Sequence, residues 1–559
     1  MRRNRFSVSL LSQLKANFVG EASQCPMERR LRYDFLMGSL SRSDNLGRMR
    51  DRAVWDIVVI GGGATGLGAA VDAASRGYGT LLLESNDFSQ GTSSRSTKLI
   101  HGGVRYLEQG NIPLVREALR ERGILFKNAP HLVHPRDFVV PAYRWHELPY
   151  YGAGLKVYDL LAGRLRLGWS RWVSRAEVKR RIPTIRGAGL RGGIVYTDGQ
   201  FDDARLAITL ARTLVDLGGT ALNKVPVTGL TKHNGRISGV TARDDESGEE
   251  FAIEARTVIN ATGVNVDAVR RLDDPLAPPL LTLSQGAHLV LDRSFLPGRT
   301  ALLVPRTEDG RVLFAIPWHD RVLVGTTDTP TTEPAREPRP LDAEVAYMTE
   351  YVERYLDRRP DSGDILSAFA GLRPLLRGPD GAVTSKLSRE HAVVISDSGL
   401  VTVTGGKWTT YRRMAVDAVD HAARVAGLPA RISATAGLRL HGWCKDLTKG
   451  DDPLSVYGSD VPRLMELMNE QPEWTQPLHP ALPYRAGEVI WAAREEAARS
   501  VADVLARRTR ALFLDARASS EAAPRVAGLL ATELGRDALW QDQQVADFLN
   551  LASGYRASG

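Results

Sequence analysis

Three glycines with a fixed spacing are the first residues in the chain that imply a chemistry. Gly61, Gly63 and Gly66 form a G-x-G-x-x-G motif within the segment VWDIVVIGGGATGLGAA. In such a motif the first glycine permits a tight turn, and the second lets a pyrophosphate approach the backbone. The third lets the following helix pack closely on the preceding strand. The motif therefore predicts a site for a phosphate-bearing dinucleotide.

Glu84 narrows the choice of dinucleotide. It follows Gly66 at close to the ~20-residue interval that is typical of the acidic residue in these sites. A carboxylate at this position accepts hydrogen bonds from ribose hydroxyls and repels a 2′-phosphate. The pattern therefore argues against NADP and leaves FAD or NAD.

A strand, a helix and a second strand must hold these residues in place. The apolar run at 57–60 has the β-branched character of a buried parallel strand, and 80–83 reads as its neighbour. Between them, 64–76 reads as a helix of small residues. The diphosphate would then lie at the positive end of that helix, where backbone N–H groups have no partner within the helix.

The composition of the whole chain limits the alternatives. A length of 559 residues predicts two or three domains, and 43% hydrophobic residues provide for a sizeable core. The formal net charge of +8 favours an anionic partner, which at this point is a phosphorylated substrate, an anionic membrane face or nucleic acid. The basic residues are dispersed and no recognition module occurs, so nucleic acid is not expected.

Cysteines and long apolar runs are both scarce. Cys25 and Cys444 are the only two cysteines, too few for a Cys₄ iron–sulfur or zinc site, and no other metal motif occurs, so no metal is expected. Two cysteines fit a reducing, cytoplasmic environment. No apolar run approaches the ~20 residues of a membrane span, so any membrane contact is expected to be peripheral.

Other segments of the chain also have patterns that predict their secondary structure or their disorder. Residues 1–53 form a basic extension that we expect to be disordered. Residues 281–328 read as antiparallel strands, with a hairpin that turns at 319–321. Residues 258–263 read as a strand that ends in a small-residue turn. Helices are predicted over 113–126, 202–217 with an acidic cap, 341–356, 411–426, 461–468 and 487–507.

The stretch 150–181 is aromatic and basic. It contains Tyr150, Tyr151, Tyr158, Trp169 and Trp172 with several lysines and arginines. Leucines and a tyrosine at 155, 158, 161 and 165 recur at helical spacing. This pattern fits either an amphipathic surface helix or a helix packed on its own domain.

Eight motifs occur in an order that resembles one enzyme family. They are GGGATGLGAA, TSSRSTKLIHGGVRYLEQG, DDARL, INATG, FAIPWHDRVLVGTTD, FAGLRPL, SREHAV and VTGGKWTTYR. Together they resemble the FAD-dependent sn-glycerol-3-phosphate dehydrogenases, which belong to the amino-acid-oxidase-like flavoproteins. The resemblance covers roughly residues 54–520 and is to the bacterial aerobic type, because the calcium-binding tail of the mitochondrial relatives is not found in the sequence.

The resemblance implies an α/β fold with FAD as the cofactor. A Rossmann-like FAD-binding domain at 54–428 would carry an inserted antiparallel β-sheet cap, about 129–199 and 281–364, and a helical domain would follow at 429–559. The implied cofactor contacts are Gly61, Gly63, Gly66, Glu84, Ser94, Ser96, Lys98, Leu99, Ala261, Gly263, Gly405 and Gly406.

The same resemblance implies the reacting residues. sn-Glycerol 3-phosphate would be oxidised to dihydroxyacetone phosphate by hydride transfer to FAD. A dianionic phosphate needs cationic partners, and the substrate hydroxyl needs a base. His101, Arg105, Arg373 and Lys407 are the implied catalytic residues, with His101 as the base. The implied substrate-binding residues are Arg105, Tyr106, Arg373, Arg389 and Lys407.

The family passes its electrons to a membrane quinone. The resemblance therefore implies a protein of the cytoplasm that docks peripherally on the anionic inner face of the cell membrane, with 150–181 as the docking surface, and it allows a homodimer. Two alternatives stay open: a glycerol-3-phosphate oxidase that uses O₂, and a flavin-binding scaffold without catalysis.

Overall fold

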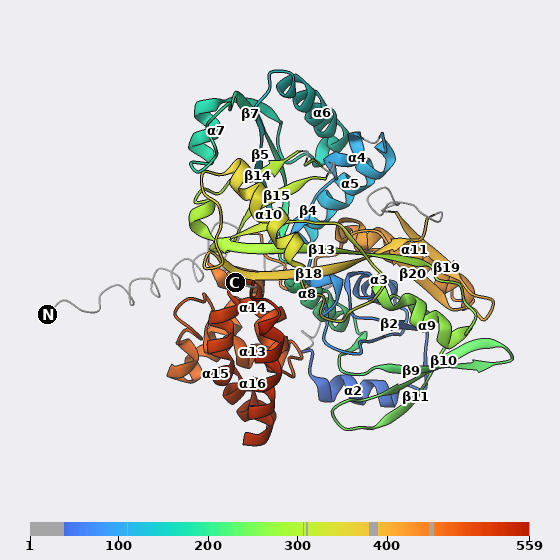
Figure 1. The fold of residues 1–559 in the computed structure, drawn as a ribbon. Coiled ribbons are helices and arrows are strands. Elements are labelled where there is room, and N and C mark those ends of the chain that lie inside the picture. The colour runs from blue at the N-terminus through green and yellow to red at the C-terminus, as the bar shows by residue number, and fades with distance from the viewer. Residues whose placement is uncertain are drawn as a thin grey trace, which may run out of the picture. The chain divides into compact units, whose positions relative to one another are not determined.

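The computed structural model describes residues 39–557, except for 109, 306, 309–310, 379–389 and 446–451. Within this part the chain forms three β-sheets with helices around them (Figure 1). The fold class inferred from the sequence, a Rossmann-like nucleotide domain with an antiparallel cap sheet and helices at the C-terminal end, is confirmed.

A six-stranded sheet carries the glycine motif. Its order is β19-β20-β12-β2-β3-β8, and all neighbours are parallel except β19 and β20. Its strands are β2 (Ile57–Ile60), β3 (Thr80–Leu83), β8 (Thr220–Leu222), β12 (Val258–Asn260), β19 (His391–Ile395) and β20 (Val401–Gly405).

The two faces of this sheet have different partners, because successive side chains of a strand point to opposite faces. Ile57 and Val59 pack in a core with α3 (Ala64–Ser75), α8 (Asp203–Asp216) and α11 (Tyr411–Val425). Val58 and Ile60 pack in a second core against a four-stranded sheet. That sheet has the order β1-β11-β10-β9, with β1 (Val54–Trp55), β9 (Val227–His233), β10 (Arg236–Arg243) and β11 (Glu250–Ala255).

A ten-stranded sheet forms the cap. It runs β17-β13-β16-β15-β14-β5-β7-β4, with β18 also paired to β13 and β6 to β7, and it is antiparallel except where β14 meets β5. The strands are β4 (Leu99–Ile100), β5 (Val133–Ala142), β6 (Arg171–Ser174), β7 (Gly192–Phe201), β13 (Leu281–Asp292), β14 (Ala301–Val304), β15 (Leu313–Trp318), β16 (Arg321–Gly325), β17 (Thr329–Thr331) and β18 (Ile365–Leu376).

Helices on the cap side of the molecule come from the middle of the chain (Figure 1). They are α4 (Val104–Glu108), α5 (Ile112–Asn128), α6 (Glu147–Ala162), α7 (Arg175–Arg181) and α10 (Asp342–Tyr355). In α6, Leu155 and Tyr158 are buried against the cap, so this stripe packs on its own domain. The same helix exposes Tyr150, Val157 and Leu160.

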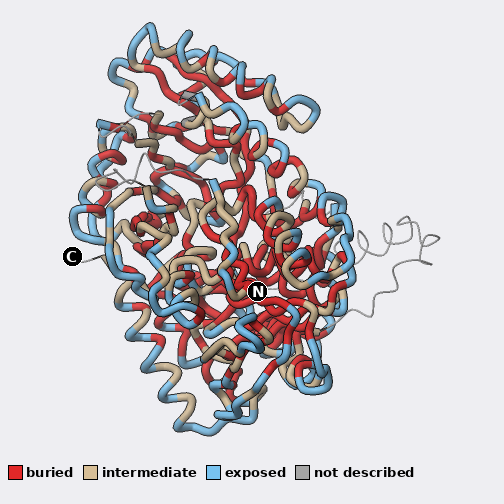
Figure 2. Tube along the Cα trace, turned by 90° about the vertical axis from the view of Figure 1, so that its right-hand side faces the viewer, coloured by how far each residue is buried: buried red, intermediate tan, exposed pale blue. Residues whose placement is uncertain are grey.

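The C-terminal helices share a core with the cap sheet. They are α12 (Val461–Glu470), α13 (Ala486–Glu495), α14 (Ala511–Leu514), α15 (Ala516–Leu534) and α16 (Ala538–Ser553). The apolar residues of α13, α14, α15 and α16 pack with Val290, Leu323 and Phe369 of β13, β16 and β18. Figure 2 shows the interior strands as buried and the outer turns of these helices as exposed.

Two expectations from the sequence are wrong. The single helix expected at 487–507 is broken, because the chain turns at Ala497, whose φ is +52°, and the preceding Glu496 is turned inward to pair with Arg205. A π-helical turn, Asp503–Arg508, follows.

The N-terminal extension is also ordered over part of its length. Residues 42–51 form α2 (Arg42–Asp51), in which Met49 is buried and Arg42 pairs with Asp244. Residues 1–38 lie outside the described part.

Candidate active site

A cavity of about 1110 Å³ extends from the glycine turn after β2 to the cap sheet. The loop that follows β3 lines one side of it, and the small-residue turns after β12 and β20 line another. These are the carboxyl ends of parallel strands, where open α/β sheets bind their ligands. The remaining wall comes from strands of the cap and from α6.

The glycine turn has the shape that a diphosphate requires. Gly61 has φ +110° and donates its N–H to the carbonyl of Leu83 at 2.9 Å. A Cβ on Gly66 would lie 1.9 Å from the carbonyl oxygen of Gly61, so only glycine lets α3 approach the turn this closely. Gly63 begins α3 without a side-chain cap, and Ala64 and Thr65 of the first helical turn border the cavity. An anion there faces the positive end of the helix dipole.

Glu84 holds the glycine turn and also borders the cavity. One carboxylate oxygen accepts the N–H of Gly62 at 2.6 Å, and the other accepts the N–H of Asn86 at 2.7 Å. Burial raises the pKa of this carboxyl, and the two backbone hydrogen bonds oppose that shift. Its position beside the cavity fits the predicted contact with a ribose.

The loop residues predicted to contact the cofactor divide into two groups. Ser96 and Leu99 line the cavity, whereas Ser94 and Lys98 do not. The Lys98 ammonium is fully buried behind the loop, where it donates to Asp203 and to the carbonyl of Ser94, both at 2.7 Å. Any contact of Lys98 with a cofactor would therefore come from its backbone.

Two small-residue turns complete the predicted cofactor wall. Ala261 and Gly263 border the cavity after β12, and Gly405 and Gly406 border it after β20. The last two have φ of +80° and +68°, and a Cβ on Gly405 would lie 2.6 Å from the carbonyl oxygen of Glu390. A helical turn at Trp408–Thr410 then leads into α11.

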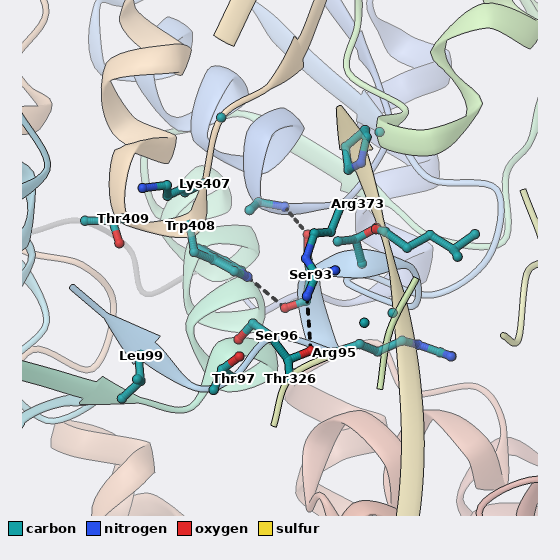
Figure 3. Close-up of a pocket in the computed structure, with 18 of the residues that line it drawn as sticks. Ser93, Arg95, Ser96, Thr97, Leu99, Thr326, Arg373, Lys407, Trp408 and Thr409 are labelled. Atoms are coloured by element: carbon teal, nitrogen blue, oxygen red, sulfur yellow. Dashed lines mark hydrogen bonds between the residues drawn. The ribbon is translucent and has the colours of Figure 1, made fainter. Parts of the chain in front are cut away.

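Four of the residues implicated in substrate chemistry line this same cavity. They are His101, Tyr106, Arg373 and Lys407. Figure 3 shows Arg373 and Lys407 on opposite sides of Trp408 and Ser93, which are joined by a 2.8 Å hydrogen bond from the indole N–H to the Ser93 carbonyl. The Lys407 ammonium lies 3.8 Å from the centre of the Tyr106 ring. Residues some 300 positions apart in the sequence are thus brought to one cavity.

Arg373 is fixed in place by the cap sheet. It lies on β18, and its guanidinium donates to Thr326 Oγ1 at 3.0 Å and to the Thr327 carbonyl at 2.9 Å (Figure 3). Asp328 lies 3.4 Å away as an ionic partner. These contacts orient a guanidinium, the group best suited to bind a phosphate in bidentate fashion.

His101 has the protonation state that a base needs. Burial lowers its pKa to about 4, and the positive charge of Lys407 acts in the same direction, so the imidazole is neutral at pH 7. Its backbone is held from both sides by Thr409, whose Oγ1 accepts the His101 N–H and donates to the His101 carbonyl, each at 3.3 Å.

Arg105 and Arg389 are the two remaining arginines of the implicated set. The backbone of Arg105 lies in α4, one turn after His101. Arg389 lies outside the described residues.

The cavity also has lining residues that the sequence did not single out as functional. Arg95 is buried and forms an ion pair with Glu337. The Thr97 hydroxyl and His288 Nε2 share a hydrogen bond of 3.0 Å. His288 stacks on Phe369 with ring centroids 4.8 Å apart. Burial lowers the pKa of His288 well below its usual value. Arg95 and Thr97 lie inside the motif TSSRSTKL, and this motif was the feature of the sequence that could have identified them as lining residues.

The fold and the site define the class of protein, and comparisons agree. Residues 56–412 match a family model described as FAD dependent oxidoreductase, and residues 430–544 match one described as the C-terminal domain of alpha-glycerophosphate oxidase. The glycine cradle, the helix end and Glu84 fit the diphosphate and ribose of FAD. The protein is an FAD-dependent oxidoreductase.

More specific relatives identify the family. The mitochondrial glycerol-3-phosphate dehydrogenase of Mus musculus is 39% identical over 554 residues, covering 92% of this chain and 76% of the relative. That of Arabidopsis thaliana is 38% identical, covering 90% and 86%. The glycerol-3-phosphate dehydrogenase from Bacillus halodurans, solved in complex with FAD, superposes with a TM-score of 0.76 and 29% identity, covering 93% of this chain and 98% of that one. The chain belongs to the FAD-dependent glycerol-3-phosphate dehydrogenase family.

Proposed function

We propose that the protein oxidises sn-glycerol 3-phosphate to dihydroxyacetone phosphate with FAD and passes the electrons to a membrane quinone. The observation that carries the proposal is the meeting of Arg373, Lys407 and neutral His101 in the cavity that also holds the dinucleotide cradle. The names of the relatives, which are glycerol-3-phosphate dehydrogenases, support the choice of substrate.

Each side chain has a role in this proposal. Arg373 and Lys407 bind the substrate phosphate and orient the glycerol backbone, because a dianion is stabilised by fixed cations in a partly dehydrated site. A neutral nitrogen of His101 takes the proton of the C2 hydroxyl as the carbonyl forms. FAD, when bound, supplies the acceptor for the C2 hydride. The bound phosphate would also raise the pKa of His101, which makes it a stronger base in the complex.

The proposed acceptor site is the surface around α6, which we call the aromatic–basic surface. Its members are exposed or half-exposed apolar and cationic side chains: Tyr150, Lys156, Val157, Leu160, Arg164, Arg166, Trp169, Arg171 and Trp172. The guanidinium carbon of Arg166 lies 3.6 Å from the Trp169 ring centroid. A surface of aromatic and cationic groups suits the boundary of an anionic bilayer. In the described part of the chain, no helix combines the length and apolar character needed to cross a bilayer. We therefore propose peripheral docking on the inner face of the cell membrane.

One experiment tests the substrate. Protein loaded with FAD is mixed with sn-glycerol 3-phosphate without oxygen, and the visible flavin absorbance is followed. We expect bleaching with this compound and none with glycerol or an amino acid. An unchanged spectrum with glycerol 3-phosphate would refute the proposal.

A second experiment tests the acceptor. Turnover is measured with a short-chain quinone in the absence of oxygen and with air alone. We expect turnover with quinone and little hydrogen peroxide in air. Rapid peroxide formation without quinone turnover would instead identify an oxidase.

A third experiment tests the docking surface. Binding to vesicles that contain anionic lipid should fall when Arg164 and Arg166 are both changed to glutamine, and Arg517→Gln, at an exposed arginine of α15, serves as the control. Equal binding by the double variant and the control would contradict the assignment.

A further inference from the structure

Three arginines near the C-terminal end contact both ends of the loop that lines the cavity. Residues 85–97 follow β3, and most of them border the cavity. The loop is rich in Ser and Thr, and Phe88 is its one fully buried large apolar side chain. Apolar packing therefore contributes little to its shape, and polar contacts must hold it.

The first contact is at Asp87. Arg508 donates to its two carboxylate oxygens at 2.6 and 2.9 Å, and Arg507 donates to one of them as well. All three side chains are buried. Burial acts to raise the pKa of the Asp87 carboxyl, but the charges of Arg508 and Arg507 outweigh it and hold that pKa well below its usual range.

The second contact is at Ser94, at the other end of the loop. Its carbonyl accepts a hydrogen bond from Arg510 at 2.7 Å and another from Lys98 at 2.7 Å. Arg510 is itself fixed, since it has φ +70°, donates to the Ala506 carbonyl at 2.9 Å and lies 3.3 Å from Asp203.

The loop is in turn joined to the glycine turn. The N–H of Ser89 donates to the carbonyl of Gly62 at 2.9 Å, two residues beyond Asp87. Asp87 is thus a buried carboxylate close to the place where FAD must put its diphosphate. Two guanidinium groups compensate its charge, which would otherwise oppose an anion at the turn.

We propose that Arg507, Arg508 and Arg510 are positioning residues for FAD: through them the C-terminal helices hold residues 85–97 in the shape that binds the cofactor. The arginines act through Asp87 and Ser94 and do not border the cavity themselves. The proposal depends on FAD binding and is independent of the substrate and of the electron acceptor. It assigns the C-terminal helices a part in cofactor retention.

The test compares two equally buried ion pairs between the nucleotide domain and the C-terminal segment. Arg508→Met breaks the pair with Asp87. The control, Arg212→Met, breaks a pair with Asp460 at 2.6 Å that does not touch the loop. FAD is removed from each protein, and its affinity is measured by fluorescence titration beside the melting temperature of the apoprotein.

We expect both variants to melt earlier than the parent and only Arg508→Met to bind FAD at least about tenfold more weakly. In Arg508→Met the Asp87 carboxylate keeps Arg507 as an ionic partner and loses the other guanidinium. Changing Asp87 to Asn in that background removes the carboxylate charge and should recover part of the affinity. Equal FAD affinity in the two single variants, or no recovery in the double variant, would overturn the proposal.

A second comparison covers the case in which Arg508→Met does not fold. Arg510→Met leaves the Ser94 carbonyl with Lys98 as its donor, so the backbone keeps a hydrogen bond. We expect weaker FAD binding than in Arg212→Met together with an altered visible spectrum of the bound flavin. If Arg510→Met had the same FAD affinity and the same flavin spectrum as Arg212→Met, the role of Arg510 would be refuted.

Discussion

Replacing Gly66 by alanine tests the physical basis of the cofactor cradle. The added Cβ would lie 1.9 Å from the Gly61 carbonyl oxygen and 3.0 Å from its carbon. Non-bonded carbon atoms rest at about 3.5–4.0 Å, so the overlap is severe. Gly61 cannot turn away freely, because its N–H is bonded to the Leu83 carbonyl. The helix α3 must therefore move away from the turn.

The size of the effect follows from two opposing contributions. Overpacking of a close contact costs up to about 3 kcal/mol, and this overlap with backbone belongs at the upper end. Alanine in place of glycine inside a helix returns up to about 1 kcal/mol. We expect a net loss of about 2 kcal/mol in the free energy of unfolding. Because the same movement opens the diphosphate site, we also expect FAD to bind at least about tenfold more weakly.

The assay pairs this variant with Gly47→Ala. Gly47 is also helical, in α2, but a Cβ added there would meet nothing within 4 Å, so alanine should stabilise the protein by up to about 1 kcal/mol. Denaturant unfolding of the apoproteins gives the stability, and fluorescence titration gives the FAD affinity. If Gly66→Ala matched Gly47→Ala in both measurements, the steric argument for the cradle would be refuted.

Three further predictions concern the site and one buried carboxyl. His101→Asn should lower kcat by about 10²–10⁴-fold while FAD stays bound, and an unchanged kcat would remove His101 as the base. Lys407→Met should raise the KM for glycerol 3-phosphate by about 10- to 100-fold, from the loss of a hydrogen bond to a charged group, and steady-state kinetics would show it. Burial raises the pKa of Glu488 to about 7 from an ordinary 4.5, so its stabilising contribution is complete below pH 4.5 and is lost as the pH rises through 7. Glu488→Gln should therefore melt like the parent at pH 4.5 and be more stable by about 3 kcal/mol at pH 8, and equal melting profiles at both pH values would contradict this.

Local patterns in the sequence were sufficient for much of the fold. The strand at 57–60, the helix beginning at Ala64 and the strand at 80–83 occur as expected, because each is fixed by an apolar run or by glycines within a few residues. The acidic cap of α8 is confirmed, since the Asp202 side chain accepts the N–H of Arg205 at 3.0 Å. The hairpin also turns where expected, between Trp318 and Arg321.

Features that depend on distant partners were not predictable in the same way. The break after α13 exists because Glu496 reaches Arg205, and no pattern near 487–507 carries that information. α2 has few apolar residues of its own, and it is held by the burial of Met49 against another sheet and by the pairing of Arg42 with Asp244. Tertiary contacts of this kind override local propensity.

The candidate site shows the same difference between residues that local patterns predict and residues that distant contacts bring together. The glycine turn is local in sequence, so the glycine spacing and Glu84 directly predicted a dinucleotide site there, and the family motifs then chose FAD over NAD. Arg373 and Lys407 were found only through the family motifs, because their meeting with His101 depends on the pairing of β18 with β13 and on the turn after β20. Lys98 shows a limit of motif reasoning, since its neighbours line the cavity while its own side chain is buried on the other side of the loop.

The position of α6 connects the proposed chemistry with the proposed acceptor. Tyr150 and Val157 of this helix border the cavity and are also exposed on the aromatic–basic surface, and Leu160 is exposed about one turn beyond Val157. A quinone held at this surface would therefore contact side chains that also border the cavity. If α6 is the route, changing the exposed Leu160 to Asp should slow turnover with quinone and leave anaerobic bleaching by substrate unchanged. An equal loss of quinone turnover and of anaerobic bleaching would instead mean that the substitution disturbs the cavity. If neither rate fell, α6 would not be the route to the acceptor.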